Sequence, residues 1–194
     1  MRKLQFAVFG AAVLVAAVLG YLISIQIQGT SSPLVRIGGD FALASSRGGE
    51  VQSQSLRGSP YAVFFGFTHC PEVCPTTLYE MSGTLTKFGD AAKDFRVFFI
   101  TVDPERDTVE KMRDYIASFD PRMEALVPTV EQLPKLASDF RIYFAKVPTS
   151  DVSYTMDHTA SVFLMDAEGQ FAGTISFGEA AELREAKLRK LLGL

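Results

Sequence analysis

The sequence of 194 residues contains no tryptophan, only two cysteines and only two histidines. An iron–sulfur cluster needs more cysteine ligands than this chain has, so the cysteine count excludes that kind of site. A structural disulfide normally closes a longer loop than the one between Cys70 and Cys74, because the stabilisation grows with loop length. The two cysteines therefore indicate local chemistry, and a plain disulfide without further function is the alternative.

The sequence also lacks a basic stripe. Lys and Arg number 19 against 22 Asp and Glu, which gives a formal net charge of −3, and the basic residues are scattered along the chain. Proteins that bind nucleic acid cluster their positive charge against the phosphate backbone. We therefore expect no nucleic-acid partner.

One long apolar run, residues 6–25, stands near the amino terminus. About twenty helical residues span roughly 30 Å, the thickness of the hydrocarbon core of a bilayer. Arg2 and Lys3 precede the run and the next basic residue is Arg36, so the positive-inside rule places Met1 in the cytoplasm and the rest of the chain across the membrane. We predict one transmembrane helix here. A cleaved secretion signal is the alternative, but its apolar stretch is usually shorter and ends at a small-x-small site, which this run lacks.

The surroundings of this anchor predict its membrane. No cysteine lies near the end of the run for lipid attachment, and no Arg- and Ser-rich presequence precedes it for mitochondrial import. The simplest location is a bacterial inner membrane, with the carboxyl-terminal domain in the periplasm. We expect a cytoplasmic tip and anchor over residues 1–28, a polar tether over residues 29–36, and one domain over residues 37–194.

The domain alternates strand and helix patterns in an order typical of an α/β thioredoxin-like fold with a mixed central sheet. Parallel strands joined by helices come first, and an antiparallel hairpin follows near the carboxyl end. The apolar run 61–67 predicts a strand buried on both faces. The other expected strands are a small hairpin over residues 41–51 and the segments 96–102, 161–165 and 171–177, and the expected helices run from Pro75 to Gly89 and over residues 107–119, 131–140 and 179–192.

The cysteines lie in the segment Gly-Phe-Thr-His-Cys-Pro-Glu-Val-Cys-Pro, residues 66–75, between a buried strand and the start of a helix. Reactive groups of α/β sheets gather at the carboxyl ends of strands. The amino terminus of a helix favours negative charge, which lowers the pKa of a nearby thiol. Three residues separate the cysteines where a thioredoxin-type redox motif has two, and the wider spacing suits two thiolates that bind one ion.

The donor atoms narrow the choice of metal. A soft pair of thiolates prefers copper(I), zinc or an iron–sulfur cluster, and zinc would need two further good ligands. Copper accepts two thiolates and one imidazole, so His69 and His158 are the candidates for a third ligand. We favour His158, because in a thioredoxin-like fold the loop before strand 161–165 faces the cysteine loop. A cis-proline often occupies that loop, and here no proline follows Pro148.

Three further features near these residues carry predictions. Asp107 is expected to cap the helix that follows it, with Glu110 completing a capping box. For Asp103 we weigh a plain turn against a supporting role beside the metal or a charge presented to a partner. The segment 143–156 is predicted to be a long loop, a mobile flap that carries His158. Met156 has a thioether that copper(I) accepts, but we expect it to fill a gap in the core.

With these residues identified, the chain resembles the Sco/SenC family, also called the PrrC group. Three segments carry the resemblance, namely residues 66–75, residues 103–108 with the sequence Asp-Pro-Glu-Arg-Asp-Thr, and residues 157–159 with the sequence Asp-His-Thr. The segment 37–41 resembles the entry of the family's domain, and Glu72 stands where the family usually has Asp.

The resemblance implies one copper ion per chain, as copper(I) or copper(II), bound by Cys70, Cys74 and His158. It also implies a metallochaperone, more than an enzyme, that helps to assemble the dinuclear copper centre of cytochrome c oxidase. Subunit II of that oxidase would be the partner, which receives copper or has its cysteines reduced. A periplasmic copper donor or thiol reductant would be a further partner.

Two enzymatic alternatives remain. A periplasmic thiol–disulfide oxidoreductase, or a redox sensor, would use Cys70 as the attacking thiolate and Cys74 as the resolving thiol. A peroxidase of the peroxiredoxin kind shares the fold, but its catalytic cysteine usually stands in a different local sequence.

Overall fold

The computed structural model describes residues 14–21, 36–150 and 153–194 of the chain. It divides into two compact units, Met1–Val35 and Arg36–Leu194. In the first unit residues 14–21 are helical, and the rest of the predicted transmembrane helix and nearly all of the predicted tether lie outside the described residues. Within the described ranges, no helix combines the length and the apolar character that a membrane span requires.

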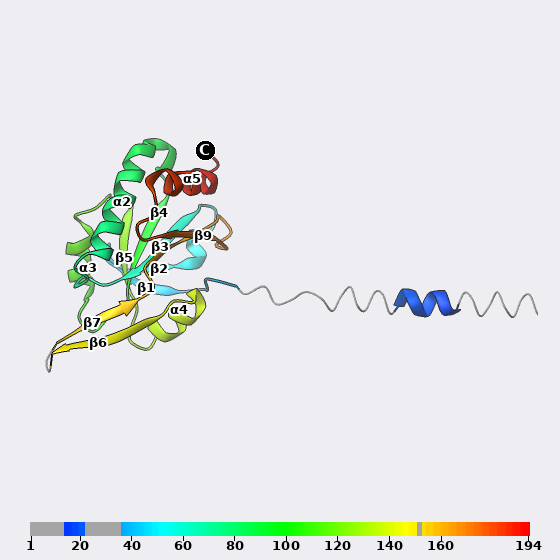
Figure 1. Ribbon diagram of the computed structural model, residues 1–194, viewed down its shortest axis with the longest axis horizontal. Coiled ribbons are helices and arrows are strands. Elements are labelled where there is room, and N and C mark those ends of the chain that lie inside the picture. The colour runs from blue at the N-terminus through cyan, green and yellow to red at the C-terminus, as the bar shows by residue number, and fades with distance from the viewer. Residues whose placement is uncertain (1–13, 22–35, 151–152) are drawn as a thin grey trace, which may run out of the picture. The chain divides into compact units, whose positions relative to one another are not determined.

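The second unit is built on a seven-stranded mixed sheet with the strand order β2-β1-β5-β4-β3-β8-β9 (Figure 1). Strands β3, β4 and β5 are parallel, while β8 and β1 join this group antiparallel at its two sides. The strands of the sheet are β1 (Ala42–Ser45), β2 (Glu50–Gln52), β3 (Tyr61–Gly66), β4 (Arg96–Thr101), β5 (Met123–Val127), β8 (Ser161–Met165) and β9 (Phe171–Ser176). The predicted α/β fold with a mixed central sheet is confirmed.

Helices cover both faces of this sheet, which explains why β3 is apolar without interruption. Val63 and Phe65 pack on the side of α4, whereas Ala62 and Phe64 pack on the side of α2, α3 and α5. Successive side chains of a strand point to opposite faces, so a strand with two covered faces must be apolar at every position. The helices are α2 (Val73–Phe88), α3 (Val109–Ile116), α4 (Leu133–Phe140) and α5 (Ala181–Leu192), with short 3-10 helices at Ser53–Leu56 and Gly89–Ala92.

Strand β5 is a third parallel strand that the sequence analysis did not predict. Its sequence, Met-Glu-Ala-Leu-Val, contains one charged residue in a strand that is otherwise apolar. Glu124 is only 2% exposed, and its carboxylate accepts hydrogen bonds from the Ser45 hydroxyl and from the guanidinium of Arg96. A buried carboxylate needs such partners, which come from distant parts of the sequence, so the apolar pattern alone could not reveal this strand.

The segment 143–156 forms a hairpin, so the prediction of an irregular loop was wrong. Strands β6 (Phe144–Ser150) and β7 (Ser153–His158) pair antiparallel and make a separate two-stranded sheet, drawn as the two yellow arrows in Figure 1. Most residues of β6 are exposed, and Pro148 stands within the strand. This polar composition concealed the strand pattern.

The cap of helix α3 also differs from the prediction. Thr108 is the N-cap residue, and its hydroxyl accepts a hydrogen bond of 3.3 Å from the backbone N–H of Lys111. Asp107 lies one residue earlier and is completely buried. The carboxylate of Asp107 therefore does not cap the helix, and it has a different set of partners near the cysteines.

Candidate metal centre

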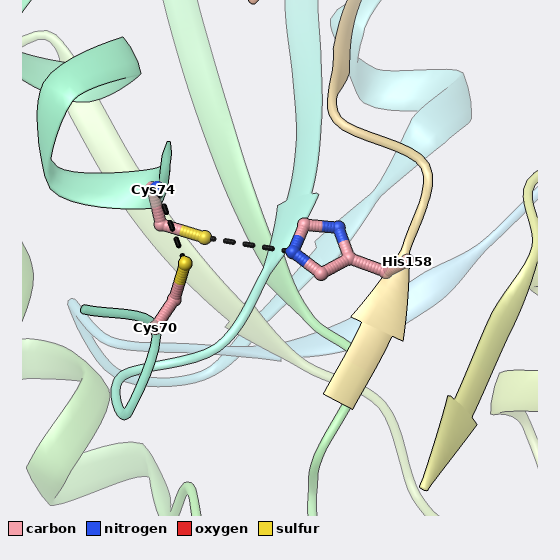
Figure 2. Close-up of side chains that lie close together, drawn as sticks. All are labelled: Cys70, Cys74 and His158. Carbon is pink, nitrogen blue, oxygen red and sulfur yellow. Dashed lines mark hydrogen bonds between the residues drawn. The ribbon is translucent and has the colours of Figure 1, made fainter. Parts of the chain in front are cut away.

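Two cysteines and one histidine meet at the carboxyl end of β3. The ligand atoms of Cys70, Cys74 and His158 all lie within 4.8 Å of one another. The Cys74 Sγ is 3.7 Å from the His158 Nε2, and the backbone N–H of Cys74 donates a 3.3 Å hydrogen bond to the Cys70 Sγ. Figure 2 shows the two sulfurs side by side with the imidazole directed at them from the end of β7. The structure thus brings the three predicted ligands together.

The cysteines are positioned by the turn from β3 into α2. Cys70 lies in this turn and is partly exposed, whereas Cys74 lies in the first helical turn and is fully buried. Gly66, the last residue of β3, allows this close packing: a Cβ atom there would lie 2.6 Å from the Cys74 Sγ and 2.5 Å from a ring carbon of Phe99. Because Gly66 has no side chain, the Cys74 sulfur can pack directly against the backbone of β3.

The orientation of His158 is set by three contacts. His158 is the last residue of β7 and pairs with Phe144 of β6. Its Nδ1 lies 3.0 Å from the carbonyl oxygen of Thr159, and its ring stands edge-on to Phe67 with 5.7 Å between the ring centroids. Since a carbonyl oxygen can only accept, we assign the proton to Nδ1, which leaves the lone pair of Nε2 free to face the sulfurs.

The two thiols differ strongly in acidity. A hydrogen bond from the Cys74 side chain, together with weaker hydrogen bonds from backbone groups of α2 and of the turn before it, lowers the pKa of Cys70 to about 4. That same hydrogen bond to Cys70, followed by burial, raises the pKa of Cys74 well above its ordinary value. At neutral pH the pair therefore consists of one thiolate and one thiol, with the thiolate on the more accessible cysteine.

The other candidate ligands lie elsewhere. His69 is half exposed, and its Nδ1 lies 3.1 Å from the Thr68 hydroxyl and 3.8 Å from the Asp107 carboxylate. It does not belong to the group formed by the cysteines and His158. Met156 is buried among the apolar residues of the core, as expected of a gap-filling side chain.

Asp107 has a larger role beside the site than the sequence analysis assigned to it. Its carboxylate accepts hydrogen bonds from the backbone N–H and the hydroxyl of Thr68, at 3.0 and 2.5 Å, and from the hydroxyl of Thr101 at 2.7 Å. Thr68 stands two residues before Cys70, so Asp107 ties the cysteine turn to the end of β4. The sequence pattern of residues 103–108 does not reveal this contact, because Thr68 and Asp107 are 39 residues apart in the chain.

Asp103 is buried as well and reaches the hairpin that carries His158. Its carboxylate forms an ion pair with Arg106 and accepts a 2.9 Å hydrogen bond from the hydroxyl of Tyr154 on β7. Asp103 does begin a turn, because its carbonyl accepts hydrogen bonds from the backbone N–H groups of Arg106 and Asp107, but its buried carboxylate is not an exposed charge. The structure places this carboxylate between the β4–α3 loop and the hairpin.

The donor set of this site suits a soft metal ion. Two sulfurs and one imidazole nitrogen converge, one sulfur is already a thiolate, and the imidazole presents an unprotonated nitrogen. Thiolate and imidazole donors select ions such as copper(I) and zinc over hard cations. By fold and site the protein is a thioredoxin-like α/β domain with a group of side chains that can hold one soft metal ion.

Comparisons with known proteins give the family. The SCO1/SenC family model matches residues 29–193, so the chain belongs to the SCO1/SenC family, and the resemblance noted in the sequence is confirmed. It is 34% identical to mitochondrial SCO1 homolog 1 of Arabidopsis thaliana over 145 residues, which are 74% of this chain and 43% of that protein. It is also 34% identical to a SCO2-like protein of Rickettsia conorii over 139 residues, which are 71% of this chain and 68% of that protein.

Solved structures agree with this assignment. ScoI of Bradyrhizobium japonicum with copper bound is 44% identical and superimposes with a TM-score of 0.74, covering 80% of this chain and 99% of that one. ScoI of Arabidopsis thaliana with copper bound is 31% identical, with a TM-score of 0.75 over 81% of this chain and 98% of that one. The likeness confirms the thioredoxin-like fold of the Sco proteins for residues of the second unit.

Proposed function

We propose that this protein binds one copper ion through Cys70, Cys74 and His158. The observation that carries the proposal is the convergence of their ligand atoms within 4.8 Å in a member of the SCO1/SenC family. The copper-bound structures of two similar Sco proteins support the choice of metal. Copper(I) is stabilised by the two thiolates, and the imidazole supports either copper(I) or copper(II).

The proposed role of the bound copper is assembly of the dinuclear copper centre in subunit II of cytochrome c oxidase. The ion would be cargo that the domain hands over, or the cysteine pair would reduce the cysteines of the oxidase. A metallochaperone needs a site that is reachable from solvent, and the partial exposure of Cys70 and His158 meets this requirement. A periplasmic copper donor or thiol reductant would complete the cycle.

We further propose that residues 6–25 anchor the protein in a bacterial inner membrane, with residues 37–194 in the periplasm. The apolar run and the basic residues before it support this topology. In cells, alkaline phosphatase fused after residue 194 should be active, and the full chain should stay in the membrane fraction after alkaline washing. Release into the soluble fraction would instead indicate a cleaved signal.

Copper stoichiometry tests the metal site. The reduced wild-type protein is expected to bind one copper ion per chain, and Cys70→Ser and Cys74→Ser are expected to lose tight binding. His158→Ala should bind more weakly, and His69→Ala, the matched control on the exposed imidazole, should bind as the wild type does. A wild-type domain that binds no copper at micromolar concentration would refute the proposal.

A thiol–disulfide oxidoreductase is the second candidate, favoured by the low pKa of the accessible Cys70 and the buried thiol of Cys74 beside it. The two functions differ in their need for His158. The variants can be expressed in a strain that lacks the chromosomal gene for this protein. An oxidoreductase role predicts that His158→Ala restores cytochrome c oxidase activity and that Cys70→Ser does not. The copper role predicts that both variants fail.

A further inference from the structure

The position of His158 is not fixed by the central sheet. Its hairpin, β6–β7, forms a sheet of its own, and β8 begins only at Ser161, three residues beyond the imidazole. At the base of the hairpin, two hydrogen bonds join Tyr143 and Thr159. The remaining support within the described residues must come from side chains that pack between the hairpin and the domain.

Met156 and Tyr154 of β7 are side chains of that kind: Met156 is buried in the core, and Tyr154 makes polar contacts to the domain. Residues 154, 156 and 158 of β7 share one face, because side chains alternate along a strand. The Tyr154 hydroxyl donates to the Asp103 carboxylate at 2.9 Å, and the Tyr154 carbonyl accepts a 2.9 Å hydrogen bond from Arg106. The Arg106 guanidinium also lies over the Tyr154 ring, 3.7 Å from its centroid. Backbone, ring and hydroxyl of this one residue are therefore all held by the β4–α3 loop, residues 102–108.

The same loop holds the cysteine turn. The Asp107 carboxylate accepts hydrogen bonds from the backbone N–H and the hydroxyl of Thr68, two residues before Cys70. The loop itself is cross-linked by hydrogen bonds: the N–H of Asp107 donates to the carbonyl of Asp103, and the N–H of Asp103 donates to the Thr101 hydroxyl. One short, internally bonded segment thus contacts both halves of the metal centre, with Asp107 on the cysteine side and Asp103 with Arg106 on the histidine side.

We propose that Asp103, Arg106 and Tyr154 are positioning residues that set the distance between the His158 imidazole and the two cysteine sulfurs. The inference rests on the proposed copper site and adds residues that bind no metal. They act through His158, because Tyr154 is four residues from it on the same strand face. Substitution of residues that orient metal ligands typically lowers metal affinity by about 10- to 100-fold.

The first test compares two conservative variants with a matched control. Tyr154→Phe removes one hydroxyl and keeps the ring, and Arg106→Lys keeps the charge and loses the planar fork. Glu105→Gln is the control. It breaks an ion pair between Glu105 and Lys146 that links the same loop to the same hairpin, but the side chains of both residues are about half exposed. We expect copper affinity to fall about tenfold or more in the first two variants and by less than about twofold in the control. Equal affinities in Tyr154→Phe, Arg106→Lys and Glu105→Gln would overturn the proposal.

The second test asks whether the effect passes through His158. In a His158→Ala background, Tyr154→Phe should change the remaining copper affinity by less than about twofold, because the residue that it positions is gone. An equal loss in both backgrounds would mean that Tyr154 acts on the fold as a whole, which would contradict a positioning role. Urea unfolding of each variant separates this outcome from simple loss of stability.

A third measurement needs no copper. In the metal-free protein, NMR should show a cross-peak between the His158 and Phe67 rings, whose centroids are 5.7 Å apart. This cross-peak should weaken in Tyr154→Phe and persist in Glu105→Gln. If the wild type binds no copper while the cross-peaks behave in this way, the proposed function fails and the positioning role stands. If copper binds and the cross-peak is unchanged in Tyr154→Phe, the positioning role fails.

Discussion

At the scale of single residues, the two cysteines of this protein are chemically unequal although they are only four residues apart. Cys70 is accessible and accepts hydrogen bonds from the first turn of α2, whereas Cys74 is buried beneath it. A metal ion that binds two thiolates therefore finds Cys70 already deprotonated, whereas the thiol of Cys74 must lose its proton when the metal binds.

This asymmetry predicts the pH dependence of alkylation in the reduced, metal-free protein. The pKa of Cys70 is lowered to about 4, so its thiolate forms as the pH rises through that value and persists at every higher pH. The rate of reaction with iodoacetamide, followed by mass spectrometry, should therefore reach half of its plateau near pH 4. Cys74→Ala removes the main cause of the shift and should move the midpoint toward the value of about 8.5 for an unperturbed cysteine. His69→Ala should leave it unchanged, and a wild-type midpoint near 8 would contradict the structure.

Gly66 predicts a second effect at this scale. A Cβ atom at this position would lie 2.5 Å from the Phe99 ring and 2.6 Å from the Cys74 sulfur, and both neighbours are fully buried. Gly66→Ala should therefore lower the free energy of unfolding by about 1–3 kcal/mol and weaken copper binding.

Gly83 is the matched control, because it lies within α2 and a Cβ atom there would meet nothing within 4 Å. Gly83→Ala should raise the free energy of unfolding by up to about 1 kcal/mol, since alanine is the better helix former. Urea denaturation measures both variants. Equal effects of the two substitutions would show that the packing around Gly66 is looser than described.

At the scale of secondary-structure elements, the β4–α3 loop has two neighbouring residues with different tasks. Thr108 caps α3, and Asp107 accepts hydrogen bonds from the partly buried Thr68 and the buried Thr101. Sequence reasoning assigned the cap to Asp107, because aspartate followed three residues later by Glu110 fits a capping pattern. The partners of Asp107 lie on β4 and on the cysteine turn, and only folding brings the cysteine turn to it.

The two residues should differ in their contribution to stability. Thr108→Ala removes one exposed cap and should lower the free energy of unfolding by about 1 kcal/mol. Asp107→Ala leaves the buried Thr101 hydroxyl and two partly buried donors of Thr68 without their acceptor, each costing up to about 1–3 kcal/mol, so a loss of about 3 kcal/mol or more is expected. Chemical denaturation of both variants at one pH checks the ranking. A larger loss in Thr108→Ala would contradict the greater structural role that the buried contacts assign to Asp107.

At the scale of the whole molecule, the proposed copper site joins two parts of the domain that are far apart in sequence. The Cys74 sulfur and the His158 nitrogen belong to residues 84 positions apart, one on α2 and one on the separate hairpin. A ligand that binds only the folded arrangement stabilises it by mass action.

Copper should therefore raise the unfolding temperature of the reduced protein. At a free concentration about 100-fold above the dissociation constant, the gain is about 2.7 kcal/mol, which corresponds to a rise of roughly 5–10 °C for a domain of this size. Differential scanning fluorimetry of residues 1–194 in detergent measures the shift. Cys74→Ser should show no such rise. If copper does not change the unfolding temperature of the wild-type protein, a copper site formed by the folded state is contradicted.

Elements whose signals are local could be predicted from the amino-acid sequence alone. The apolar run of β3, the proline and glycine at the two ends of α2, and the spacing of Cys70 and Cys74 each depend on neighbours within a few residues. From these, the α/β order and the sulfur pair could be predicted, and the expected fold then favoured His158 over His69. The predicted anchor over residues 6–25 has the same local character and stays a prediction.

Features that depend on distant partners became visible only in the folded chain. Strand β5 is hidden in the sequence by Glu124, which pairs with Arg96 and accepts a hydrogen bond from Ser45, and the hairpin β6–β7 is hidden by its polar exposed residues. Asp103 and Asp107 looked like ordinary turn and cap residues until folding brought Tyr154 and Thr68 to them. A buried carboxylate is tolerated only where donors converge on it, and that convergence is a property of the folded chain.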